Sequence, residues 1–170
     1  MNELDVIKAL QEGIDESINK PQAVISVFVS RFDKMCDELM QSNNIPKSKL
    51  GIINATKCYH EINKFKSENI RTLFASTGVK SDELDQGYYI NNLLYPNSVN
   101  TAPLNTIENW ILSDDKKIAN IIEEQECNDF FDNIKSKDIY MNKIYDKLLN
   151  DGLISFKNSF EELKIKLKSI

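Results

Sequence analysis

Two short segments of the sequence carry side chains suited to holding a phosphate group. Arg31 comes directly after the apolar run 23–29, and its planar guanidinium is able to donate to two phosphate oxygens at once. The second segment, 76–80, reads Ser-Thr-Gly-Val-Lys, in which hydroxyls donate, glycine lets a ligand approach the backbone and lysine supplies charge. This segment lacks the glycine spacing and the Lys-Ser/Thr ending of a P-loop, so an ordinary loop is the competing interpretation.

Both segments follow predicted β-strands. Residues 23–29 form a short apolar, β-branched run without alternation, which is typical of a parallel strand buried on both faces. Residues 70–76 read as the next strand and residues 98–101 as a short third one. Because sites in parallel α/β proteins lie at the carboxyl ends of strands, we expect Arg31 and segment 76–80 at the same edge of the sheet.

Apolar residues at spacings of three and four predict helices before, between and after these strands. The first helix covers residues 3–19, and segment 88–94 fits either a short helix or an extended piece. Asn105 and Glu108 have the spacing of an N-terminal capping box, and Gly152 indicates a break between two terminal helices. Strands that alternate with helices imply right-handed crossovers and a parallel sheet.

Composition narrows the class of protein. The chain has 170 residues, of which 41% are hydrophobic and 28% charged, and this predicts one ordinary globular domain over residues 1–170. The net charge of −5 disfavours nucleic acid as a partner. We expect a cytoplasmic protein without membrane contact, because no apolar run could span a bilayer and the acidic start lacks a signal-peptide pattern. The cysteines lack the spacing of a metal or redox motif and are expected to be reduced, small apolar residues on helices: Cys36, Cys58 and Cys127.

Three segments in a fixed order resemble the transaldolases. They are AVISVFVSR at 23–31, LFASTGVK at 73–80 and SVNTAP at 98–103. The resemblance is to the bacterial subgroup whose strand six carries Ser-x-Phe-Val-x-Arg and whose strand seven ends in Ser-Thr-Gly-Val-Lys. Segment 152–163 also looks like that family's last helix, so the resemblance covers essentially the whole chain.

The resemblance implies an α/β fold that is the carboxyl-terminal portion of a (β/α)₈ TIM barrel, namely strands six to eight and the following helices. A complete barrel typically needs ~250 residues, so residues 1–170 are expected to form a partial barrel that lacks strands one to five. The implied reaction is transfer of a dihydroxyacetone unit between sugar phosphates in the pentose phosphate pathway, through a Schiff base on a lysine. It uses no metal and no organic cofactor. The implied substrates are of the fructose 6-phosphate and sedoheptulose 7-phosphate class.

Carried onto this chain, the resemblance also implies roles for individual residues. It places Ser26 near the Schiff-base carbon and Phe28 on the pocket wall. It assigns the substrate phosphate to Arg31 and Ser76, with Lys80 beside them. The family's nucleophilic lysine, its acid and base carboxylates and its pocket asparagines have no counterpart here, so we expect no catalytic residue in this chain and no activity from it alone.

Simpler interpretations stand beside these roles. Ser26 and Phe28 are otherwise ordinary strand residues. Arg31 is also placed to pair with a carboxylate of the following helix, and Lys80 fits a solvated loop. A different class of function, a non-catalytic partial barrel that assembles with a complementary amino-terminal half or a second copy, is the main alternative. A third is that Lys80 acts as its own Schiff-base nucleophile.

Overall fold

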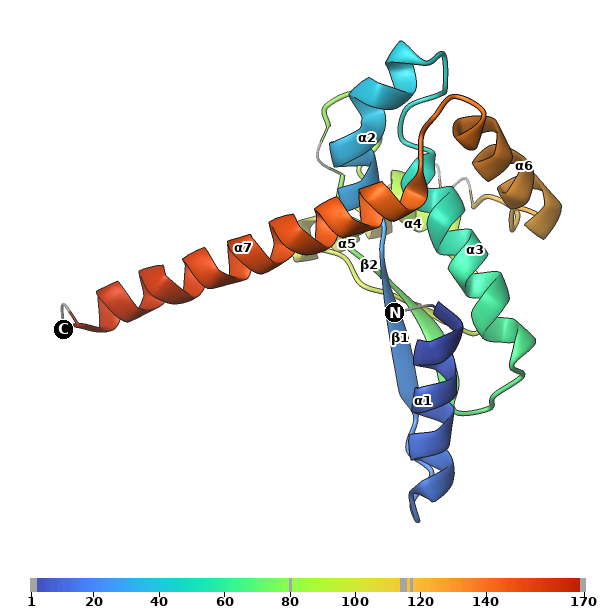
Figure 1. Cartoon of the computed structure of the whole chain (residues 1–170), viewed down its shortest axis with the longest axis vertical. Helices are drawn as coiled ribbons and strands as arrows, with labels where there is room; N and C mark the ends of the chain where they lie inside the picture. The colour runs from blue at the N-terminus through green and yellow to red at the C-terminus, as the bar shows by residue number, and fades with distance from the viewer. Residues whose placement is uncertain (1–2, 80, 114–115, 117, 169–170) are drawn as a thin grey trace. The chain divides into compact units, whose positions relative to one another are not determined.

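The computed structural model describes residues 3–79, 81–113, 116 and 118–168 (Figure 1). The chain divides into two compact units, Met1–Asp132 and Asn133–Ile170. The elements in chain order are α1 Glu3–Glu16, β1 Ala23–Phe28, α2 Ser30–Ser42, α3 Leu50–Lys64, β2 Ile70–Ala75, α4 Tyr88–Leu93, β3 Ser98–Asn100, α5 Leu104–Leu112, α6 Glu124–Lys135 and α7 Met141–Lys168.

The first unit holds a three-stranded sheet in the order β1-β2-β3, and both strand pairs are parallel. Ala23 lies opposite Ile70, and Thr72 lies opposite Ser98. Helices α2 and α3 connect β1 to β2, and α4 lies between β2 and β3. The predicted parallel α/β class is therefore confirmed, and all three strands direct their carboxyl ends to one edge of the sheet.

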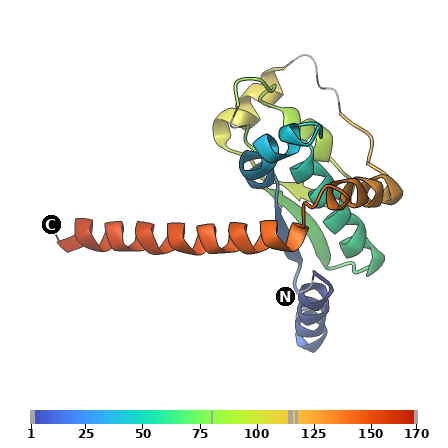
Figure 2. The same ribbon diagram turned by 45° about the horizontal axis from the view of Figure 1, so that its top comes forward.

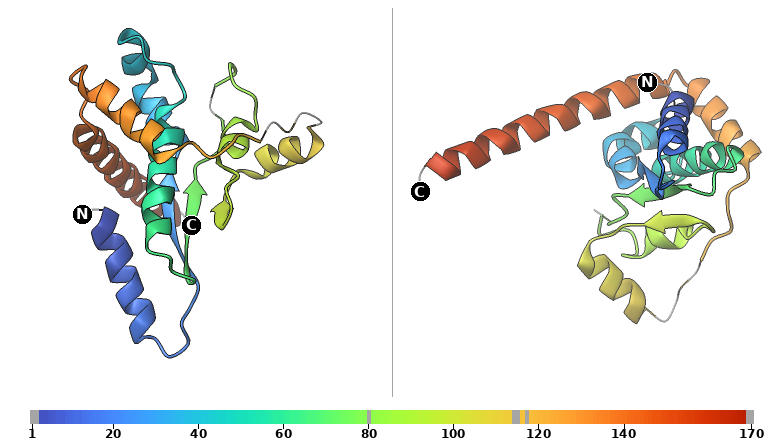
Figure 3. Two further views of the ribbon diagram at one scale, coloured as in Figure 1. Left: turned by 90° about the vertical axis from the view of Figure 1, so that its right-hand side faces the viewer. Right: turned by 90° about the horizontal axis from the view of Figure 1, so that it is seen from below.

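Helices cover one face of this sheet. Helix α3 packs on β1 and β2, and α1 packs on α3, as Figure 3 shows. Phe74 of β2 is fully buried at the centre of a cluster that includes Ile52 of α3 and Tyr95. A second cluster closes the other end of the same face, with Ile7, Ile14, Ile62 and Ile70 as its buried members. These apolar contacts hold the strand ends in fixed positions relative to α2 and α3.

The other face of β1 is open. Val24 is 40% exposed, Phe28 is 46% exposed, and Ser26 between them is exposed as well. These three residues share one face because side chains alternate along a strand. The prediction that β1 is buried on both faces is therefore wrong, because the described residues leave one face of this apolar strand exposed.

Several element ends differ from the prediction. The strands end one residue earlier than predicted, at Phe28, Ala75 and Asn100, and α1 ends at Glu16 rather than at residue 19. Segment 88–93 is helical. Helix α5 begins after Pro103 without a side-chain hydrogen bond at its N-cap, so the predicted capping box is wrong.

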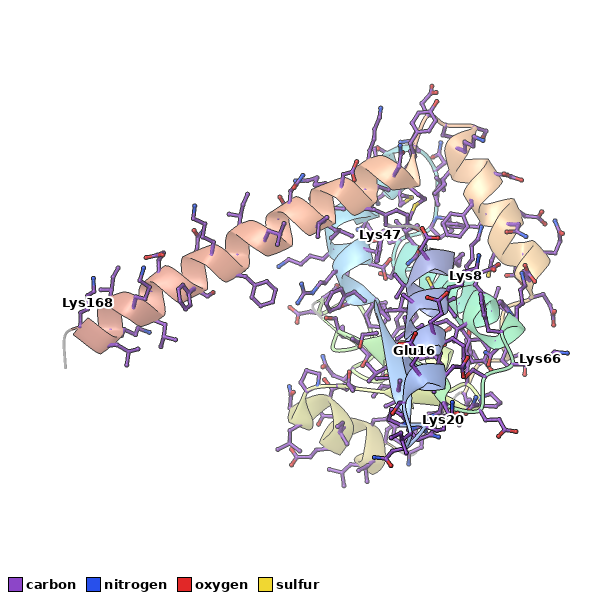
Figure 4. The ribbon with its side chains drawn as sticks, turned by 60° about the horizontal axis from the view of Figure 1, so that its bottom comes forward. Lys8, Glu16, Lys20, Lys47, Lys66 and Lys168 are labelled. Atoms are coloured by element: carbon purple, nitrogen blue, oxygen red, sulfur yellow. The ribbon has the colours of Figure 1, made fainter. Side chains whose placement is uncertain are left out.

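The second unit is dominated by α7, a 28-residue helix. It continues through Gly152, so the predicted break there is wrong: one glycine inside a helix costs only about 1 kcal/mol. Phe156 is 74% exposed and Phe160 is 61% exposed, and Figure 4 shows side chains projecting from the helix as far as Lys168. Among the described residues, no helix is both long enough and apolar enough to cross a membrane.

The three cysteines lie on helices and are buried, as predicted. Cys36 is in α2, Cys58 in α3 and Cys127 in α6, and none of them forms a disulfide. Burial raises the pKa of Cys36 and that of Cys127 to about 11. Both thiols are therefore protonated near neutral pH, and a buried thiol of this kind is a poor nucleophile.

Candidate functional site

The site is built where β1 passes into α2. Only Val29 separates the last residue of the strand from the first residue of the helix. The passage of the strand into the helix can be followed in Figure 2. The Val29 N–H donates to the Ala75 carbonyl and the Ser30 N–H donates to the Ser76 carbonyl, each at 3.0 Å. These bonds extend the β1–β2 pairing past the strand ends. The start of α2 is thus fixed against the segment that follows β2.

A cavity of about 310 Å³ lies at this edge of the sheet. It is lined by side chains from the first turn of α2, from the segment after β2 and from the residue before α5: Ser30, Arg31, Lys34, Ser76, Gly78 and Pro103. None of the described residues that line it is acidic. The position matches the expectation that polar groups gather at the carboxyl ends of parallel strands.

Arg31 and Ser76, predicted from separate strands, are brought together. The Arg31 Nε–H donates to the Ser76 hydroxyl at 3.3 Å, and the guanidinium carbon lies 4.2 Å from the centre of the Phe28 ring. Within the described residues, Arg31 has no ion pair with a carboxylate. The structure therefore does not show the alternative, a pairing with a carboxylate of the next helix. Among the described residues, most of the five guanidinium donors have no protein partner.

Backbone geometry shapes the second wall of the cavity. Ser76 has a φ of 57°, the left-handed region that non-glycine residues seldom adopt. A Cβ atom on Gly78 would lie 2.9 Å from Pro103 Cγ, so this position requires glycine. Thr77 is fully buried and donates its hydroxyl to the Thr101 carbonyl at 2.6 Å. Of the two hydroxyls in this segment, only that of Ser76 is available to the cavity.

The remaining predicted residues lie apart from the cavity lining. Ser26 and Phe28 are on the open face of β1, and Phe28 reaches the site only by stacking under Arg31. This contact is a cation–π interaction, which helps to hold the guanidinium in place. Lys80 lies outside the described residues.

The structure adds two residues that the sequence analysis missed, Ser30 and Lys34. Lys34 is three residues after Arg31, so both cations lie on the same side of α2. Among the described side chains, no carboxylate forms an ion pair with Lys34. Ser30 is only 5% exposed yet lines the cavity. The sequence does contain a signal for Lys34, because it is a lysine one helical turn after Arg31 in a helix that begins directly after a strand.

The site therefore suits an anion rather than acid–base chemistry. It combines two cationic side chains, serine hydroxyls and the N-terminal end of α2, where backbone N–H groups carry partial positive charge. A phosphate group, with about two negative charges and three terminal oxygens, matches this donor set. Among the described residues, no three His, Cys, Asp or Glu side chains are grouped as a metal site requires.

Fold and site together define a parallel α/β protein with an anion-binding cavity at its strand ends. Residues 2–167 match the family Transaldolase/Fructose-6-phosphate aldolase. The chain is 46% identical to the transaldolase of Helicobacter pylori (strain Shi470) over 142 residues, which cover 84% of this chain and 44% of that protein. It is 40% identical to the transaldolase of Campylobacter jejuni (strain RM1221) over 151 residues, 88% of this chain and 44% of that protein.

The chain belongs to the transaldolase/fructose-6-phosphate aldolase family. It spans less than half the length of the curated relatives that it matches.

Proposed function

We propose that this chain is the phosphate-binding, carboxyl-terminal part of a transaldolase barrel. In this proposal β1, β2 and β3 are strands six, seven and eight. The chain takes part in transfer of a dihydroxyacetone unit between sugar phosphates, and the Schiff-base lysine is supplied by a part of the barrel outside this chain. The observation that carries the proposal is the Arg31–Ser76 pair in a cavity at the carboxyl ends of parallel strands.

The open face of β1 supports the partial barrel. Apolar side chains such as Val24 and Phe28 line the interior of a closed barrel, where neighbouring strands exclude water. Leaving them exposed loses about 25 cal/mol for each Å² of apolar area. Additional parallel strands, curving away from β1, would cover this face.

In the proposed complex, Arg31 binds the phosphate through its guanidinium fork. Ser76 shares a phosphate oxygen, and Lys80 lies further along the same segment. Ser26 lines the pocket beside the Schiff-base carbon, and Phe28 forms part of the wall and supports Arg31. Substrates are sugar phosphates of the fructose 6-phosphate class, in the cytoplasm, and this chemistry needs no metal or organic cofactor.

The same open face supports a second candidate function: a non-catalytic module that assembles with a partner chain, either a complementary amino-terminal half or a second copy. This candidate shares the exposed Val24 and Phe28 but requires no substrate at Arg31. A covalent substrate adduct distinguishes the two candidate functions, because only the first of them leads to one.

Borohydride trapping with fructose 6-phosphate tests the proposal. One sample is this chain alone, and the other is a fusion of this chain to the part of the Helicobacter pylori transaldolase that it does not match. Reduction of a Schiff base leaves a stable adduct that mass spectrometry assigns to one lysine. We expect no adduct on the chain alone and one adduct in the fusion, on the added part.

An adduct on Lys80 of the chain alone would overturn the view that the nucleophile lies elsewhere. A folded fusion without any adduct would favour the non-catalytic module.

A further inference from the structure

Asp33 is a buried carboxylate that lies beside the candidate site without lining it. It is 1% exposed and comes two residues after Arg31 in α2. Among the described residues, no lysine or arginine forms an ion pair with it. A buried carboxylate without a counterion is costly unless hydrogen bonds satisfy its oxygens.

Two other helices supply those hydrogen bonds. The Gly51 N–H, in the first turn of α3, donates to Asp33 Oδ1 at 2.8 Å. The Tyr89 hydroxyl, from α4, donates to Asp33 Oδ2 at 2.9 Å. One carboxylate therefore joins α2, α3 and α4.

The contact at Gly51 is too close for any other residue. A Cβ atom there would lie 2.4 Å from the Val29 carbonyl oxygen and 2.9 Å from Asp33 Oδ2. The first turn of α3 thus rests directly on the β1–α2 junction. The free N–H groups of that turn carry partial positive charge, which favours an ionised carboxylate facing them.

The hydrogen bonds that hold Asp33 also determine the direction of the Arg31 side chain. Two residues along an α-helix are separated by about 200° around its axis, so Asp33 and Arg31 project from opposite sides of α2. Fixing the Asp33 side against Gly51 and Tyr89 fixes the rotation of the first turn. The opposite side, with Arg31, is then held toward the cavity.

Tyr89 connects the same carboxylate to the other wall of the cavity. Val79, the residue after Gly78, packs against the buried cluster that includes Tyr89, the second residue of α4. Tyr89 is 3% exposed and its hydroxyl points inward to Asp33. The two segments that line the cavity are therefore tied to one buried group.

We propose that Asp33 is a positioning residue for the anion site: through Gly51 and Tyr89 it holds Arg31 in register with Ser76. The identity of the anion as a sugar phosphate rests on the proposed function, whereas the positioning of Arg31 does not. Asp33 itself contacts no substrate.

Tyr89→Phe is the test variant, with Tyr95→Phe as its matched control. Both tyrosines are buried in the same unit, at 3% and 5% exposure, and each hydroxyl has a side-chain partner at 2.9 Å. The side-chain partner of Tyr89 is Asp33, whereas that of Tyr95 is Thr56. The Tyr95 hydroxyl also has a backbone partner at Ile122, and neither of its partners belongs to the network. Each substitution removes one buried hydroxyl and keeps the ring, so the loss of stability should be similar.

The readout is the Nε–H signal of Arg31 in the ¹⁵N-arginine-labelled chain. The sequence has two arginines, Arg31 and Arg71, so Arg31→Lys assigns the signal by its loss. We expect Tyr89→Phe to shift or broaden the Arg31 signal and to weaken binding of inorganic phosphate about three- to tenfold. Tyr95→Phe should leave both unchanged. Asp33→Asn should act as Tyr89→Phe does, and more strongly.

An Arg31 signal that is unchanged in Tyr89→Phe, or equally changed in Tyr95→Phe, would overturn the positioning role. If Tyr89→Phe moves the signal while the wild-type chain does not respond to phosphate, the positioning role stands and the proposed function fails. The two failures are therefore distinguishable.

Discussion

The Arg31 Nε–H donates to the Ser76 hydroxyl across 3.3 Å, and this contact joins residues that are 45 positions apart in the chain. Each residue follows a different parallel strand, and the sheet register brings the two strand ends together. Both residues line the cationic cavity.

Lys34 is expected to strengthen phosphate binding from the edge of the site. Lys34→Met should weaken binding of inorganic phosphate about two- to fivefold, because a partly solvated cation contributes up to ~1 kcal/mol. The loss should shrink at high salt, since mobile ions screen exposed charges. Titration calorimetry at two salt concentrations measures both effects.

Lys47→Met is the control, because Lys47, labelled in Figure 4, lies in the connection between α2 and α3 and is not among the described residues that line the cavity. An equal loss of affinity in both variants would show that overall charge, rather than the site, attracts the anion.

Gly51→Ala should destabilise the chain by about 2–4 kcal/mol, because the new methyl group would meet the Val29 carbonyl and the Asp33 carboxylate. Gly13→Ala in α1 is the matched change, since nothing lies within 4 Å of a Cβ atom there. It should stabilise the chain by about 0.5–1 kcal/mol through helix propensity. Urea unfolding compares the two, and a stabilising Gly51→Ala would contradict the close α3 contact.

The local sequence predicted the strands and the residues that directly follow them, because an unalternating apolar run and its end are visible in a single short segment. Arg31 and Ser76 were found for this reason. Ser30 and Lys34 were missed because their place in the site depends on the rotation of α2, which contacts with α3 and α4 determine. The same long-range contacts explain Asp33, a carboxylate of the helix that contains Arg31, whose partners are Gly51 and Tyr89.

Other differences have physical causes of the same kind. The run 23–29 reads as buried on both faces, yet burial of the second face requires elements that the described chain does not place over β1. Gly152 read as a helix break, but its intrinsic penalty is smaller than the combined helical preference of its neighbours in α7. The local sequence predicts the intrinsic propensity of a segment, whereas the burial of its side chains depends on all the elements that pack around it.

Titration of Asp33 should affect stability in a defined direction. Burial, more than any other factor, raises its pKa from 3.8 to about 6, so the folded chain binds this proton more tightly than the unfolded chain. Its contribution to the free energy of unfolding is therefore greatest below pH 4 and falls as the pH rises through 6.

Asp33→Asn lacks this titration. Between about pH 4 and pH 7, the wild-type chain should lose about 2 kcal/mol more stability than the variant, apart from a constant offset for the altered hydrogen bonds. Urea unfolding of both proteins at the two pH values gives the difference. A wild-type chain that gains stability relative to Asp33→Asn over this interval would show that Asp33 is not buried as described.

The open face of β1 should make the isolated chain self-associate or unfold easily. Replacing Val24 and Phe28 by threonine should reduce association, since it removes exposed apolar area from one strand face. Leu104→Thr is the control, because Leu104 is 71% exposed on α5. Sedimentation velocity over a range of concentrations measures the effect, and a monodisperse wild-type monomer with a sharp cooperative melt would favour an independently folded small sheet instead.

The most direct test of the proposed function is Arg31→Ala in the fusion to the Helicobacter pylori part, with phosphorylated and unphosphorylated donors compared. A guanidinium–phosphate contact contributes roughly 1.5 to 3 kcal/mol, so KM for fructose 6-phosphate should rise about 10- to 100-fold. Schiff-base formation with dihydroxyacetone, which has no phosphate, should hardly change, and Ser76→Ala should show the same selectivity more weakly. Equal losses with both donors would contradict the phosphate role and leave Arg31 as a residue of the fold.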